Sequence, residues 1–119
     1  MEIPKIFESE YRFCEILWAH EPVSSSKLVK LCNEQLEWKK STTYTVIRRL
    51  SERGVLQSKN SIVTSLISKE EAQSAESTEV VEKNFAGSLP SFIAAFTRKK
   101  ALTKSEIEEI QQIIDAYKN

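Results

Sequence analysis

The chain has 119 residues, of which 40% are hydrophobic and 29% are charged, and its formal net charge is zero. This length supports one modest hydrophobic core. Because no segment is as apolar as a membrane span and the first residues lack the order of a secretion signal, we expect a soluble, cytoplasmic protein.

Two amphipathic helices are predicted first. The first helix covers residues 9–20 and ends before Pro22. Its apolar face comprises Phe13, Ile16 and Leu17. After a tight turn at residues 21–23, Ser24 is a good N-cap for a second helix, whose buried stripe comprises Leu28, Leu31, Cys32 and Leu36. Cys14 and Cys32 are the only cysteines, and neither has a second ligand at metal spacing. We therefore expect two reduced, buried thiols and no metal site.

A third helix is predicted from about Ser41 to Arg53, with Gly54 as its C-terminal cap. Its inner face comprises Thr43, Val46, Ile47 and Leu50. The segment from Lys39 to Arg53 holds five basic residues and a single acid, which gives a net charge of +4 in a neutral chain. The positive charge is therefore concentrated on this helix.

The spacing then changes to that of strands. Residues 55–58 and residues 62–67, the second run rich in β-branched side chains, flank a polar turn at residues 59–61, which predicts a short hairpin. Ser68 and Glu71 have the spacing of a capping box that opens a fourth helix. The first part of this helix is too polar to be buried, so we expect one domain over residues 1–67 and another over residues 68–119.

Two more helices are predicted in the second domain. Gly87 breaks the fourth helix, residues 88–90 start a fifth, and Thr103 with Glu106 forms a capping box that opens the last. A head of 67 residues offers too little surface to cover the apolar face of the last helix, so a second copy of the chain is its expected cover. The alternative is a monomer whose tail folds back on its own head. The expected homodimer interface comprises Val81, Phe85, Leu89, Phe92, Ile93, Phe96, Ile107, Ile110, Ile113, Ile114 and Tyr117.

Three helices followed by a hairpin are typical of a winged helix-turn-helix, in which the third helix enters the major groove of DNA. We therefore predict a mainly α fold with a small β-hairpin: a winged helix-turn-helix head and a C-terminal helical dimerisation arm. The outward positions of the third helix hold hydroxyls, an aromatic ring and cations, which suit phosphates and base edges. The predicted DNA-binding residues are Lys39, Lys40, Ser41, Thr42, Tyr44, Thr45, Arg48, Arg49 and, in the hairpin, Lys59.

The sequence is compatible with alternatives on two points. A shift of one residue in helix phase exchanges Arg48 and Arg49 as the base reader. The basic helix is also compatible with an ordinary solvated surface of a winged-helix module that binds another protein. An enzyme is not expected, because His20 is the only histidine and the two glycines cannot build a phosphate-binding loop. No cofactor is expected either.

Two runs of residues carry a family resemblance. WKKSTTYTVIRRLSERGVL at residues 38–56, together with SEYRFCEILWAHEPVSSSKLVKLC upstream, resembles the family of penicillinase and methicillin-resistance repressors, which also contains copper-responsive repressors. The resemblance covers essentially the whole chain. It implies a homodimer that binds a palindromic operator in double-stranded DNA and blocks transcription.

The same resemblance implies how repression ends. Repressors of this family are cut after signalling by a membrane sensor with a metalloprotease domain, and LPSFIAAF at residues 89–96 matches the cut stretch. The equivalent bond joins Ala95 and Phe96, although the better-known members have Asn before the Phe. The chain also departs from the family in its short wing, where Lys59 is the only cation. Residues 86–119 contain no cysteine, which excludes the Cys-x-Cys copper sites of the copper-responsive branch.

Overall fold

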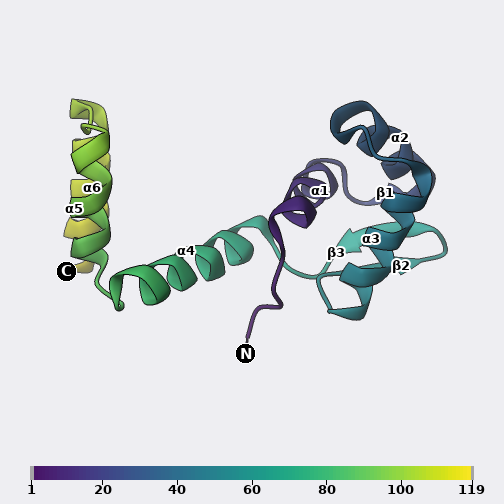
Figure 1. The fold of residues 1–119 in the computed structure, drawn as a ribbon, viewed down its shortest axis with the longest axis horizontal. Helices are drawn as coiled ribbons and strands as arrows, with labels where there is room; N and C mark the ends of the chain where they lie inside the picture. Colours follow the sequence, from purple (N-terminus) through teal and green to yellow (C-terminus); the bar gives the residue numbers. More distant parts are fainter. Residues whose placement is uncertain (1, 119) are drawn as a thin grey trace. The chain divides into compact units, whose positions relative to one another are not determined.

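The computed structural model describes residues 2–118, which form two compact units. One unit ends at Glu76 and the other begins at Ser77, so the boundary falls inside α4 (Lys69–Phe85). It lies beyond the division after Ile67 that the sequence suggested, because Ala72 near the start of α4 is buried in the core of the first unit. Helices predominate and the one sheet is small, which confirms the predicted fold class (Figure 1).

The core of the first unit lies between three helices, α1 (Glu8–His20), α2 (Ser25–Leu36) and α3 (Lys40–Glu52). Each helix contributes a fully buried leucine, namely Leu17, Leu28 and Leu50. The Phe13 ring stacks on Trp38, with 6.1 Å between the ring centroids. The predicted apolar faces of α1 and α3 are confirmed. In α2, Leu28 and Cys32 are fully buried, whereas Leu31 and Leu36 pack only at the edge of the core.

The helix ends follow from local chemistry. The Ser24 hydroxyl accepts the Lys27 backbone N–H at 3.2 Å and so caps the start of α2, as predicted. After α3, the backbone N–H of Gly54 donates to Ser51 O at 3.1 Å, and that of Val55 donates to Leu50 O at 2.9 Å. These two bonds form a Schellman motif, which requires the positive φ of 84° that Gly54 adopts.

The sheet has three antiparallel strands in the order β1-β3-β2. The predicted hairpin is confirmed as β2 (Leu56–Lys59) and β3 (Ile62–Ser65), with Leu56 opposite Ser65. The tight turn expected at residues 21–23 was incomplete, because Val23 belongs to a further strand, β1 (Val23–Ser24), which pairs with β3. A strand of two residues is too short for an alternating pattern, so its pairing depends on tertiary contacts.

The turn of the hairpin is tight and is held against α2. Asn60 and Ser61 both have positive φ, 54° and 63°, as a two-residue type I′ turn requires. The Ser61 carbonyl accepts the backbone N–H of Ser25, the first residue of α2, at 2.9 Å. The hairpin tip is therefore fixed to the start of the second helix.

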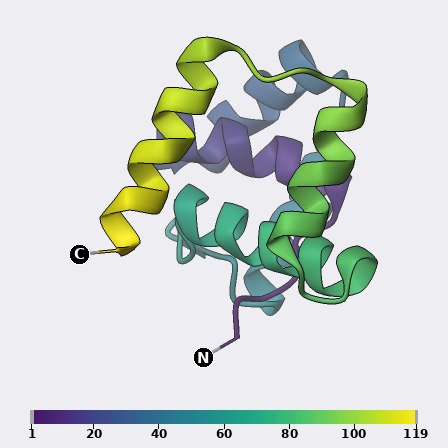
Figure 2. The same cartoon turned by 90° about the vertical axis from the view of Figure 1, so that its left-hand side faces the viewer.

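The second unit contains the end of α4, then α5 (Leu89–Lys99) and α6 (Lys104–Tyr117). Gly87 has a φ of 79° after α4, the Ser88 hydroxyl caps α5, and Thr103 with Glu106 forms the predicted capping box of α6. The capping box of Ser68 and Glu71 at the start of α4 is also confirmed. Figure 2 shows α5 and α6 running in opposite directions on either side of the segment that joins them. No residue of α5 or α6 is buried within the described chain.

Candidate nucleic-acid interface

The outer face of α3 carries the predicted DNA-binding side chains. Thr43, Val46, Ile47 and Leu50 are buried, which fixes the rotation of the helix about its axis. Thr45 is half-buried and the remaining predicted residues are exposed, namely Lys39, Lys40, Ser41, Thr42, Tyr44, Arg48 and Arg49. The structure thus brings all of these residues to one solvent-facing surface, and both arginines belong to it.

The start of α3 carries positive charge and no acid. Its first turn holds no acid, its N-cap Lys39 makes no side-chain cap, and Lys40 follows directly. In contrast, the first turns of α1 and α4 each hold two glutamates, as the positive end of a helix dipole favours. Cations at this end cost about 0.3–1 kcal/mol each, and a bound anion such as phosphate offsets that cost.

Side chains along this face are held only weakly. The Lys40 ammonium lies 6.0 Å from the centroid of the Tyr44 ring. The Arg48 guanidinium lies 4.0 Å from Glu52, and about two thirds of each side chain is exposed. Exposed pairs of this kind contribute at most about 1 kcal/mol. Arg48 can therefore exchange Glu52 for another hydrogen-bond acceptor at little cost.

Arg53 does not belong to this face, although it contributes to the net charge of the basic segment. Its guanidinium forms an ion pair with Glu10, whose side chain is only 8% exposed. This pairing joins the end of α3 to α1. The charge available on the outer face is therefore smaller than the sequence count indicated. Nothing in the local pattern reveals the contact, because the two residues are separated by 43 positions.

The hairpin of β2 and β3, which forms the wing, lies beside α3. Strand β2 packs against α3 (Figure 1). Lys59 at the end of β2 is exposed. Ile62 opposite Lys59 is 44% exposed. Lys59 is the only Lys or Arg between Leu56 and Ser65, so the wing carries one cation.

The two cysteines lie behind this surface. Burial raises the pKa of Cys14 to about 12, and the negative charge of Glu10 acts in the same direction. Burial also raises the pKa of Cys32, which the neighbouring Thr43 hydroxyl partly offsets. Both thiols are free and buried, as predicted.

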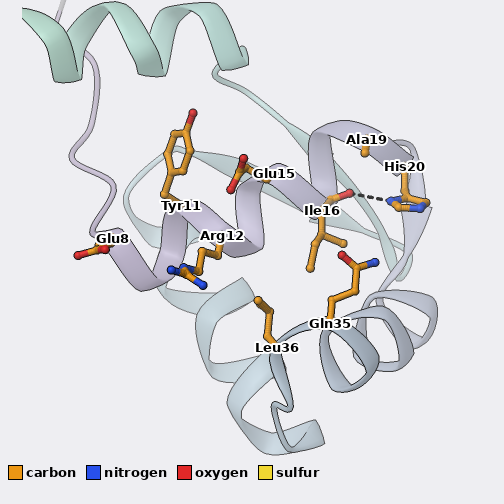
Figure 3. Close-up of a pocket in the computed structure, with 9 residues that line it drawn as sticks. All are labelled: Glu8, Tyr11, Arg12, Glu15, Ile16, Ala19, His20, Gln35 and Leu36. Carbon is orange, nitrogen blue, oxygen red and sulfur yellow. Dashed lines mark hydrogen bonds between the residues drawn. The ribbon is translucent and has the colours of Figure 1, made fainter. Parts of the chain in front are cut away.

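The depression in Figure 3 lies away from α3, between α1 and the end of α2. It contains His20, whose Nδ1 lies 2.9 Å from the carbonyl oxygen of Ile16. The other lining residues are Glu8, Tyr11, Arg12, Glu15, Ala19, Gln35 and Leu36. No serine or cysteine is among the nine residues that line it.

The residues predicted for the dimer interface lie on the helices of the second unit. Several are widely exposed, including Leu89 (54%), Phe96 (47%), Ile107 (52%), Ile113 (61%) and Tyr117 (88%). Phe85 and Phe92 are half-buried because their rings meet edge to face at 5.4 Å. Val81 and Ile110 are also half-buried, whereas Ile93 and Ile114 are exposed. The bond between Ala95 and Phe96 lies inside α5.

Among residues 2–118, no helix is long and apolar enough to cross a membrane. No group of three His, Cys, Asp or Glu side chains in that range is arranged to hold a metal ion.

Comparison with known proteins gives one consistent result. Residues 6–116 match the penicillinase repressor family. The chain is 24% identical to a penicillinase repressor of Bacillus licheniformis, over 99% of this chain and 95% of that protein. It is 27% identical to the methicillin resistance regulatory protein MecI of Staphylococcus aureus strain Mu50, over 93% of this chain and 94% of that protein. This chain therefore belongs to the penicillinase repressor family.

Proposed function

We propose that this protein is a transcriptional repressor that binds a palindromic DNA operator as a homodimer. The observation that carries the proposal is the outer face of α3, where cations, hydroxyls and Tyr44 are exposed together beside a wing. Its cation-rich first turn suits a phosphate, and its arginines suit guanine edges. Membership in a family whose relatives are named as repressors supports the same function.

The first test is a selection of bound sequences from random duplex DNA at about 0.15 M salt, with the dimer state measured on the same sample. A dimeric repressor is expected to enrich a palindrome whose half-sites are separated by about one helical turn or a multiple of it. A folded dimer that enriches no sequence would favour a protein-interaction module instead.

Two variants divide the α3 face by role. Arg48→Ala is expected to weaken binding to the selected operator by about 1–3 kcal/mol and to relax the preference for one base pair, if Arg48 reads a base. Lys39→Ala is expected to weaken binding to every duplex alike and to lower the salt dependence, because a phosphate contact carries no sequence information. Fluorescence anisotropy titrations at several salt concentrations distinguish these outcomes. Unchanged operator affinity in Arg48→Ala would remove Arg48 from the base-reading set and leave Arg49.

Dimerisation through the second unit is the next part of the proposal. Within the second unit, the apolar residues of α5 and α6 find too little cover, since neither helix has a buried residue. A hollow between α4 and α5 offers a place for a partner's side chain, and its apolar lining is Val80, Val81, Leu89 and Phe92. A contiguous apolar surface of this kind marks an interaction site.

The last part of the proposal is the release of the repressor from its operator by proteolysis. A cut between Ala95 and Phe96 would divide α5 and detach α6 from the rest of the chain. A sensor metalloprotease is the expected agent, on the basis of the family resemblance. The chain truncated after Ala95 should therefore sediment as a monomer and bind the operator at least about tenfold more weakly than the full chain. Retained dimerisation and affinity in the truncated chain would contradict this switch.

A further inference from the structure

The C-terminal end of the recognition helix is tied to the N-terminal part of the chain. Arg53 follows the last residue of α3, and its guanidinium pairs with the Glu10 carboxylate of α1. The side chains are 29% and 8% exposed. This pair is largely removed from solvent, unlike the exposed pair of Arg48 and Glu52.

Three partners hold the Arg53 guanidinium. Besides Glu10, its Nη1 donates to the carbonyl oxygen of Lys5 at 2.7 Å, and its Cζ lies 5.2 Å from the centroid of the Phe7 ring. Glu10 in turn accepts the Phe7 backbone N–H at 3.0 Å. This arrangement uses the planar fork of a guanidinium, which the point charge of a lysine does not reproduce.

The position of Arg53 in the chain gives these contacts a consequence for DNA binding. Arg53 stands between α3 and Gly54, and β2 of the wing begins two residues further on, at Leu56. Val55 and Leu56 are each only 1% exposed, so the chain leaves α3 along a buried path. The contacts of Arg53 therefore restrain the junction between α3 and β2, the two elements that would contact DNA.

We propose that Arg53 is a positioning residue for operator recognition, which acts through Glu10 and the N-terminal segment rather than by contacting DNA. This inference rests on the proposed function. Replacing a buried ion pair with apolar residues often leaves stability unchanged or raises it, so fixing a unique arrangement is one reason to retain such a pair. Here the arrangement is the orientation of α3 and the wing relative to α1.

The experiment compares full-length Glu10→Gln, Arg53→Gln and Arg53→Lys with wild type and with Lys39→Gln as the control. Affinity for the selected operator and for an unrelated duplex is measured over a range of salt concentrations, at a temperature where circular dichroism shows every variant folded. All three test variants are expected to bind the operator about tenfold more weakly, with unchanged affinity for unrelated DNA and unchanged salt dependence. Lys39→Gln is expected to lower affinity for both duplexes and the salt dependence.

Glu10→Gln is the decisive variant because it removes no positive charge. If Arg53→Gln behaves like Lys39→Gln while Glu10→Gln retains full operator affinity, Arg53 contacts a phosphate and the inference is wrong. If all three test variants melt at lower temperature but bind the operator as wild type does, the pair is merely structural and the inference is also wrong.

A measurement without DNA separates this inference from the proposed function. Amide hydrogen exchange of the free protein should be about tenfold faster at residues 51–55 in Glu10→Gln than in wild type, because the junction opens locally. Unchanged exchange at residues 51–55 would show that the pair of Arg53 and Glu10 does not restrain this junction, and the inference would be wrong. A wild-type protein that selects no operator would instead overturn the proposed function, whatever the exchange rates.

Discussion

Thr43 is a polar residue placed in the core of the DNA-binding head. Its side chain is fully buried, and Oγ1 makes no hydrogen bond within the described residues, although it lies near the Cys32 thiol. Thr43→Val replaces this hydroxyl by a methyl group of similar size. We expect the free energy of unfolding to rise by about 1 kcal/mol, because an unsatisfied buried hydroxyl carries an uncompensated desolvation cost.

Urea denaturation of both proteins measures this change. Thr45→Val is the matched control, since Thr45 is only half-buried and its replacement should change stability little. Operator affinity should be unaffected by Thr43→Val because the side chain faces the core. A loss of stability would instead show that the hydroxyl has a partner, such as the Cys32 thiol or an ordered water.

Cys14 should make the stability of the head fall at high pH. Its pKa is about 12 in the fold against an ordinary value of 9.0, so the folded state keeps the thiol proton where the unfolded chain loses it. The stabilisation from the neutral thiol is therefore complete below pH 9 and is lost as the pH rises from 9 towards 12. The slope approaches about 1.4 kcal/mol per pH unit within this window.

Cys14→Ala provides the comparison. We expect this variant to be less stable than wild type at pH 8, because the substitution leaves a cavity, and to lack the proton linkage of the Cys14 thiol. The difference in the free energy of unfolding between wild type and Cys14→Ala, measured by urea denaturation from about pH 8 to 10.5, should become smaller as the pH rises. If the free energies of unfolding of the two proteins change with pH in parallel, the pKa of the Cys14 thiol is not raised in the fold.

At the scale of elements, Gly54 determines how α3 ends. Its φ is 84°, and a Cβ at this position would meet no atom within 4 Å. Gly54→Ala therefore isolates the cost of a left-handed backbone from any steric clash, and we expect a loss of about 1 kcal/mol in stability. Gly54→Asn should lose less, since Asn tolerates this conformation better. Equal stability of wild type and Gly54→Ala, by thermal and urea unfolding, would contradict the proposed role of this cap.

Most elements of the fold follow from local chemistry and were predictable for that reason. The starts of α2 and α6 are capped by Ser24 and Thr103, and α3 and α4 end close to Gly54 and Gly87. The apolar spacing of α3 distinguishes its inner face from its outer face. These signals need only neighbouring residues. They therefore placed the exposed face of α3 on the correct side of the helix.

What the sequence did not reveal depends on contacts between distant segments. Strand β1 exists because Val23 pairs with Val63, and two residues carry no detectable period. Arg53 counts as one more cation of a basic helix until its pairing with Glu10 is seen. The predicted binding set did not include Arg53, and its contacts with Glu10, Lys5 and Phe7 could not have been inferred from spacing.

At the scale of the molecule, the chain combines a basic recognition surface with helices whose apolar faces are open. The 119 residues carry 17 basic and 17 acidic side chains, so DNA binding depends on where the charge lies rather than on the total. One head presents a single recognition helix with a short wing that bears one cation. Two heads held together would double the number of phosphate and base contacts, and operator affinity should therefore depend on the arm.

Ile114→Glu tests this dependence. Ile114 is 45% exposed in the single chain, and in the proposed dimer it would be covered by the partner. A carboxylate buried there without a partner costs several kcal/mol, so the variant should be a monomer at low micromolar concentration with poor operator affinity. Gln112→Glu is the matched control, because it adds the same charge to the far side of α6 and should leave the dimer intact.

Analytical ultracentrifugation gives the assembly state, and anisotropy titration gives the affinity of the same samples. A dimeric Ile114→Glu protein would move the interface away from this face of α6, whereas a monomer with full operator affinity would show that a single head is sufficient.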